Sequence, residues 1–250
     1  MRTVHVTRYV TPLREGGSLP AIVEADDDGL YVLKFRGAGQ GPRALIAELV
    51  SGEIARALGL SVPELVFADL DADLARTEPD PEIFALIRDS AGLNLALDYL
   101  PSSVMFDPVV EKPAAGLASR IVWFDAYVTN VDRTARNTNM LMWHRQLRLI
   151  DHGATLYFHH SPDWAANPDR ARDRFTLIRQ HVLLTRANAL ADVDAEMAGA
   201  LDAETIGRIV DLIPESWIED GAPDRETYRR YLIDRLAPPR AFVEEAIGAR

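Results

Sequence analysis

Two polar motifs separated by one predicted β-hairpin constrain this chain more than any other feature of its sequence. The first, NVDRTARN, contains Asp132 and Asn137, and the second, DHG, begins at Asp151. Between them, residues 138–143 and 147–150 have the composition of two short strands joined by a tight turn. Because a hairpin brings its two ends together, the sequence predicts that these three polar side chains lie close to one another.

The residue types in the two motifs suit phosphoryl transfer. That chemistry needs a carboxylate near the acceptor hydroxyl and oxygen ligands that hold Mg²⁺ against a triphosphate. Mg²⁺ prefers carboxylate and amide oxygens and keeps several waters, so one Asp and one Asn beside the nucleotide phosphates are enough. Asp132, Asn137 and Asp151 therefore predict ATP and Mg²⁺ as cofactors, without a dedicated cage of His or Cys ligands.

Composition narrows the class of protein. The 250 residues are 48% hydrophobic, enough for a sizeable core, and their net charge of -11 argues against general affinity for nucleic acid or an anionic membrane. With no Cys, disulfides and thiolate metal sites are excluded. The N-terminal residues lack a secretory apolar stretch, and no apolar run is long enough to span a membrane. We therefore expect a cytoplasmic protein without membrane or direct nucleic-acid partners.

Hydrophobic periodicity predicts an α+β chain whose character changes near residue 100. Before that point, one helix is expected at 44–58, and strands are expected at 3–10, 20–25, 30–35, 63–69, 84–89 and 93–100. An acidic, proline-containing loop with a helical turn is expected at 71–81. Beyond residue 100, helices dominate, at about 115–129, 187–200, 203–213, 224–236 and 238–248.

A lysine on a mostly apolar strand completes the set of candidate residues. Lys34 lies within YVLKF, where an unpaired ammonium would be costly, so an anionic partner is expected. Glu48 and Glu53 lie on the helix that follows. The motifs follow one another in the order Lys34, this helix, the Asp132 loop and the Asp151 motif. In this order the chain resembles the HipA-like kinases over about residues 14–160.

The resemblance implies a bilobed, protein-kinase-like fold that binds Mg-ATP between its lobes. A β-rich N-lobe would span residues 1–100 and a mostly helical C-lobe residues 101–250. By the same resemblance, Asp132 would be the catalytic Asp, and Asn137 and Asp151 would be the metal ligands.

The resemblance also assigns the nucleotide-binding residues. Lys34 would contact the phosphates, with Glu48 as its ion-pair partner and Glu53 as the alternative. The connection Leu97–Leu100, including Asp98 and Leu100, would be the hinge whose backbone binds adenine. The glycines of Gly16-Gly17-Ser18 would let a loop approach the phosphates, although an ordinary hairpin turn explains them equally well.

The identity of the phosphate acceptor is the least constrained prediction. We expect a Ser/Thr hydroxyl of a protein. The Asp132-Arg133 start of the loop is shared with phosphoinositide kinases, so a small-molecule or phosphoinositide-type kinase is the alternative enzyme. The other hypotheses are a nucleotide-binding pseudokinase that acts as an interaction module and a structural domain with coincidental motifs. His152 stands where many kinases have Phe in this metal-binding motif.

Overall fold

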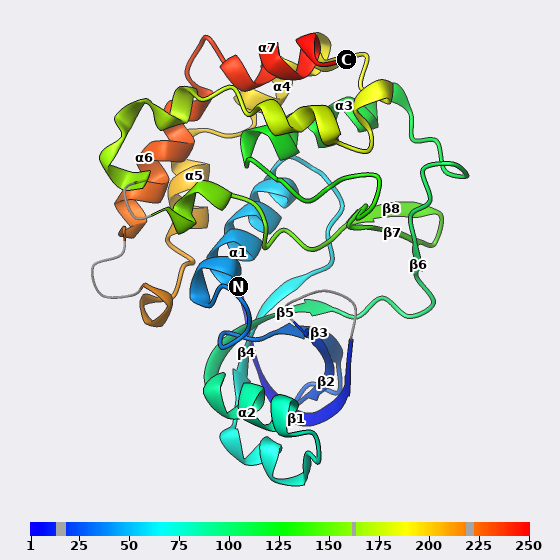
Figure 1. Cartoon of the computed structure of the whole chain (residues 1–250), viewed down its shortest axis with the longest axis vertical. Helices are drawn as coiled ribbons and strands as arrows, with labels where there is room; N and C mark the ends of the chain where they lie inside the picture. The colour runs from blue at the N-terminus through cyan, green and yellow to red at the C-terminus, as the bar shows by residue number, and fades with distance from the viewer. Residues whose placement is uncertain (14–18, 162–163, 219–222) are drawn as a thin grey trace.

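A computed structural model of the chain describes residues 1–13, 19–161, 164–218 and 223–250. A small closed β-barrel lies at one end of the molecule and a larger, mostly helical part lies at the other (Figure 1). The fold is therefore of the α+β class, as predicted. The division at residue 100 into two lobes stays a prediction.

Five strands form the barrel in the order β1-β2-β3-β5-β4. Their bounds are Thr3–Pro12 (β1), Ala21–Ala25 (β2), Leu30–Lys34 (β3), Leu65–Leu70 (β4) and Gly92–Asp98 (β5). Neighbouring strands are antiparallel except β1 and β4, whose parallel pairing closes the barrel. In each strand alternate side chains point into the barrel, which is why Leu33 is fully buried and Lys34 faces outward.

Helix α1 (Pro42–Ala57) lies between the barrel and the helical part (Figure 1). Pro42 occupies the first turn, where its missing N–H costs no hydrogen bond. The buried side chains of this helix, including Leu45, Leu49 and Ile54, belong to the large hydrophobic core of the helical part rather than to the barrel core. This packing fixes the position of Glu48 relative to the helical part of the molecule.

The prediction of a strand at 84–89 is wrong, because this segment belongs to helix α2 (Pro81–Asp89). The Asp80 side chain caps the helix by accepting a hydrogen bond from Glu82 N–H. Ile83 and Ile87, four residues apart, are its buried residues and pack in the barrel core. The preceding segment 72–77 is a 3₁₀ helix, in keeping with the helical turn expected there.

The hairpin between the two polar motifs is present. Strands β7 (Met140–Trp143) and β8 (Gln146–Leu149) pair in an antiparallel manner, and the two-residue strand β6 (Val104–Met105) adds to the outer edge of β7. Helix α3 (Ala115–Tyr127), fully buried over most of its length, leads into the loop that contains Asp132.

The remainder of the chain is helical. In the described residues of the segment after Asp151, the helices are short 3₁₀ helices, at Tyr157–His160, Trp164–Ala166, Pro168–Arg172, Thr176–Gln180 and Leu184–Arg186. The α-helices that the structure describes after this segment are α4 (Leu190–Gly199), α5 (Ala203–Val210), α6 (Arg225–Leu236) and α7 (Ala241–Gly248), with a further 3₁₀ turn at Glu215–Trp217. Among the described residues, no helix is both long and apolar enough to cross a membrane.

Candidate active site

The predicted polar residues meet at a cleft between the barrel and the helical part. Its volume is about 1080 Å³ including the open mouth. The charged and amide side chains that line it come from five parts of the fold, and they are Lys34, Gln40, Glu48, Asp132, Asn137 and Asp151. The sequence motifs thus converge on one site.

Lys34, on the barrel, contacts two carboxylates that come from other elements around the cleft. Its Nζ lies 2.7 Å from Asp151 Oδ1 and 3.8 Å from Glu48 Oε2. Burial alone would lower the pKa of Lys34, but the two carboxylates outweigh it and raise the pKa above its ordinary value. Lys34 is therefore a fixed ammonium at the wall of the cleft.

Glu48, rather than Glu53, is the glutamate of α1 that faces the lysine. Its side chain is only 2% exposed, and its Oε1 lies 3.4 Å from His152 Nδ1. Burial would raise the pKa of Glu48, but Lys34 and His152 hold it at about 2. Glu53 instead forms an ion pair with Arg56 on the same helix.

Asp132 is held by three amide groups of its own loop. Its backbone N–H donates to Asn130 Oδ1 at 3.0 Å, and its Oδ2 accepts from Asn137 Nδ2 at 2.7 Å and from Asn139 Nδ2 at 3.1 Å. Burial, together with nearby Asp151, raises the pKa of Asp132 despite these hydrogen bonds. None of these bonds uses Oδ1, so this oxygen can accept a further proton donor.

Asp151 has a left-handed backbone conformation, with φ of 56°. Aspartate tolerates this region better than most residues, since its short polar side chain bonds locally. The turn at Asp151 follows β8 and directs the carboxylate toward Lys34, while Gly153, two residues on, also lines the cleft.

The donor set at the cleft suits a hard divalent cation. The amide of Asn137 uses its nitrogen to bind Asp132, which leaves its oxygen for a metal, and Asp151 bonds Lys34 through Oδ1 only. Within the described part of the chain, no three His, Cys, Asp or Glu side chains cluster as a self-sufficient metal cage. The free oxygens of Asn137 and Asp151 are of the type that a hard cation such as Mg²⁺ prefers.

A glycine-containing loop between β3 and α1 also lines the cleft, through Ala38, Gly39 and Gln40. Gly39 has φ of +53°, with open space where a Cβ would be. Asn94 and Ser90 fix the base of the loop by accepting hydrogen bonds from the backbone. The other glycine segment, Gly16-Gly17-Ser18, lies outside the described residues.

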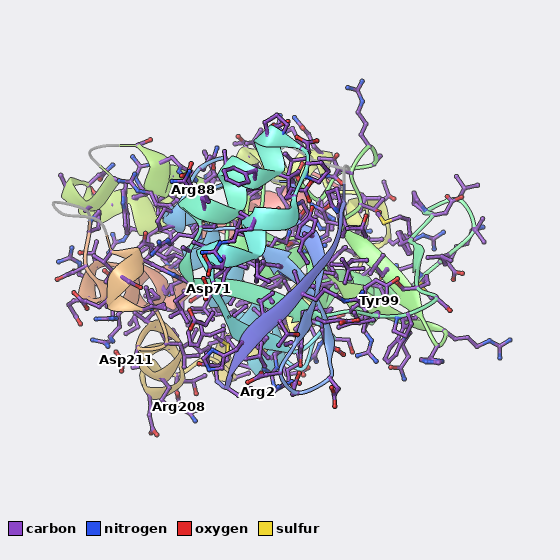
Figure 2. All side chains as sticks on the ribbon, turned by 90° about the horizontal axis from the view of Figure 1, so that it is seen from below. Arg2, Asp71, Arg88, Tyr99, Arg208 and Asp211 are labelled. Atoms are coloured by element: carbon purple, nitrogen blue, oxygen red, sulfur yellow. The ribbon has the colours of Figure 1, made fainter. Side chains whose placement is uncertain are left out.

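The predicted hinge lies at the end of β5. Asp98 is exposed and its N–H donates to the Glu64 carbonyl, while the N–H of Tyr99 donates to the Leu30 carbonyl. Figure 2, which views the barrel end, labels Tyr99 where the chain leaves the barrel. Leu100 is buried, and its N–H makes no hydrogen bond to any described residue. Neither Asp98 nor Leu100 lines the cleft as it stands.

An apolar surface beside Lys34 also escaped the sequence analysis. Val32 precedes Lys34 by two residues and so shares its face of β3, and Ile22 pairs with Val32 across the β2–β3 ladder. Both side chains are half-buried. The alternation of side chains between the two faces of β2 and β3 was the sequence signal for this surface.

Comparisons with solved structures find the same fold in two kinases. The kinase fold is shared with the Helicobacter pylori proinflammatory kinase CtkA, which has 15% identity and a TM-score of 0.57 over 99% of this chain and 98% of that one. It is also shared with the Golgi casein kinase, at 11% identity and a TM-score of 0.53 over 100% of this chain and 72% of that one. A structure of the latter with Mn/ADP bound gives 12% identity and a TM-score of 0.51, over 100% and 73% of the two chains.

The family assignment rests on sequence. The sequence model of the HipA-like kinases matches residues 6–236, so this chain belongs to the HipA-like kinase family and is a kinase. Comparison with curated proteins finds no match.

Proposed function

We propose that this kinase uses ATP and Mg²⁺ and transfers the γ-phosphoryl group to a Ser or Thr hydroxyl of a protein. The contact between Lys34 and Asp151, in the same cleft as Asp132 and Asn137, is the observation that carries the proposal. A Golgi casein kinase of the same fold binds ADP and Mn, which supports the use of a nucleotide and a divalent cation.

The nucleotide would lie between the barrel and the helical part, which we propose as lobes of residues 1–100 and 101–250. Ile22 and Val32 would offer an apolar floor for adenine, and the Leu100 N–H, which donates to none of the described residues, would be the donor in the connection proposed as the hinge. Lys34 would neutralise phosphate oxygens, while Glu48 keeps its ammonium in place.

The oxygens of Asn137 and Asp151 would hold Mg²⁺, which neutralises the phosphate charge when it is bound with ATP. Asp132 would accept the proton of the acceptor hydroxyl through its free Oδ1. The hydroxyl oxygen then bonds to the γ-phosphorus, and the bond from that phosphorus to the β,γ-bridging oxygen breaks, so that its electron pair leaves with ADP. The raised pKa of Asp132 brings it closer to the pKa that suits a general base.

Transfer from γ-labelled ATP, in the presence of Mg²⁺, tests the proposal with casein, the kinase itself, small alcohols and water as acceptors. We expect Asp132→Asn to reduce transfer at least 100-fold while it keeps the fold. Asp211→Asn is the matched control, because Asp211, labelled in Figure 2, forms an ion pair with Arg229 and neither residue lines the cleft. Full transfer by Asp132→Asn would refute the role of Asp132, and label on small alcohols but on no protein would favour the small-molecule alternative.

A further inference from the structure

Asp125 of α3 is a fully buried carboxylate that has no role in the chemistry described above. Its Oδ1 accepts a hydrogen bond from Asn130 Nδ2 at 2.7 Å. Its Oδ2 accepts from Arg133 Nε at 2.7 Å and lies 2.8 Å from His181 Nε2. Two of these partners flank Asp132 in the sequence, and the third packs against the same loop.

Two hydrogen-bonded routes lead from Asp125 to Asp132. In the first, Asn130 bonds Asp125 with its nitrogen and accepts the Asp132 N–H with its oxygen. In the second, Arg133 bonds Asp125 through Nε and the Asn139 carbonyl through Nη1. Asn139 in turn donates from Nδ2 to Asp132 Oδ2. Both the backbone and the carboxylate of Asp132 therefore depend on Asp125.

His181 fastens a distant segment to the same carboxylate. The Leu183 N–H donates to His181 Nδ1 at 3.0 Å, so in the neutral ring the proton is on Nε2 and is donated to Asp125. The backbone joins in, since Thr134 and His181 form a β-bridge and the Val182 N–H donates to the Arg133 carbonyl at 3.2 Å.

Stability alone is a poor explanation for this arrangement. A buried ion pair is often no more stabilising than apolar side chains of the same volume, because both charges lose their hydration. Arg133 is 1% exposed and Asp125 is completely buried, so the desolvation cost is close to its maximum. The pair instead fixes the orientation of the groups it joins, because a planar guanidinium holds its two acceptors in a fixed geometry.

We propose that Asp125 is a positioning residue that, through Arg133, Asn130 and His181, holds the loop of Asp132 in its reactive shape. This inference rests on the proposed function, in which Asp132 receives the acceptor proton. This network of Asp125, Asn130, Arg133 and His181 contacts neither the nucleotide side of the cleft nor Lys34. It therefore acts on turnover rather than on ATP binding.

Two variants test the network with a readout that general destabilisation would not move. Arg133→Lys keeps the charge but cannot reach Asp125 and the Asn139 carbonyl at once. Asp125→Asn keeps the size but faces three donors with only one acceptor oxygen. Arg240→Lys is the matched control, because Arg240 forms a similar fork with Asp194, with N···O distances of 2.8 and 2.6 Å, away from the cleft.

We measure Mg-ATP hydrolysis with water as acceptor, as separate kcat and KM values. Each of the two network variants is expected to lower kcat at least tenfold, with KM for ATP within twofold of the parent. The double variant should lose no more than the worse single one, since the residues act as a unit. Arg240→Lys should lower the melting temperature without lowering kcat.

Parental kcat in a folded Arg133→Lys protein, or a loss no greater than that of Arg240→Lys, would overturn the inference. If Asp125→Asn does not fold, Arg133→Lys still decides the matter. Asp132→Asn, assayed in parallel, distinguishes failure of the proposed function from failure of the positioning role. If it retains kcat, the proposed function itself fails. If it loses kcat while the network variants do not, only the positioning role of Asp125 fails.

Discussion

Lys34 and Asp151, which are 117 positions apart in the sequence, are joined by a hydrogen bond of 2.7 Å. One residue ends the third strand of the barrel and the other follows the hairpin of the helical part. Glu48, from the helix between the two cores, lies 3.8 Å from the same ammonium. A single lysine thus connects three elements around the cleft.

Chemical acylation tests whether phosphates reach this lysine. The sequence has only two lysines, Lys34 in the cleft and Lys112 on an exposed loop. Mg-ATP should protect Lys34 from an amine-acylating reagent, because the bound phosphates would cover its ammonium, while Lys112 should react at an unchanged rate. Mass spectrometry of the two lysine peptides measures both rates in one sample.

Lys112 also serves as the internal control for reagent consumption by the nucleotide. Equal modification of Lys34 with and without Mg-ATP, at nucleotide concentrations that saturate the protein, would contradict its assignment as the phosphate-binding lysine.

The buried carboxylate of Glu48 predicts a pH-dependent stability. Its pKa is about 2 in the folded chain against 4.5 for a free Glu, so its contribution is complete above pH 4.5 and is lost as the pH falls toward 2. By linkage this contribution is roughly 3 kcal/mol at neutral pH. The difference in unfolding free energy between the parent and Glu48→Gln should therefore shrink as the pH is lowered from 6 to 3.

Urea unfolding at several pH values measures that difference. Glu53→Gln is the matched control on the same helix, since its ion pair with Arg56 lies near the surface and should contribute less than 1 kcal/mol. A difference for Glu48→Gln that is constant with pH would show that Glu48 is not ionised against Lys34.

The raised pKa of Asp132 predicts the acid limb of the pH–rate profile. A general base works only when it is ionised, so the rate should fall as the pH drops through this pKa, which lies above that of an ordinary Asp. Asn139→Gly removes a hydrogen bond that lowers the pKa, while glycine keeps the left-handed backbone at φ 47°. This variant should shift the limb to higher pH, and a shift to lower pH would contradict the geometry.

Local patterns explain which parts of the site were predictable. Asp132, Asn137 and Asp151 flank one hairpin, so their proximity follows from chain connectivity alone. The contribution of α1 was less certain, because Glu48 and Glu53 differ only in which face of the helix they occupy, and packing of α1 into the large core decides between them.

Other features depend on contacts that no local pattern contains. Asp125 and His181 meet across 56 positions, and nothing in their immediate sequence signals it. The strand predicted at 84–89 failed for a different reason, since a short apolar run fits both periodicities. The cap at Asp80 and Pro81 was the signal that favoured a helix.

Thermal unfolding of the parent and of Asp151→Asn, with ATP alone, Mg²⁺ alone and both, tests most directly whether this cleft binds Mg-ATP. Asparagine keeps the size and tolerates the left-handed backbone, so the variant removes mainly the charge. At about 100 times the dissociation constant, Mg-ATP should add roughly 2.7 kcal/mol, which is several degrees, to the parent and much less to the variant. An equal shift in both proteins, or none in the parent, would contradict a nucleotide site built around Lys34 and Asp151.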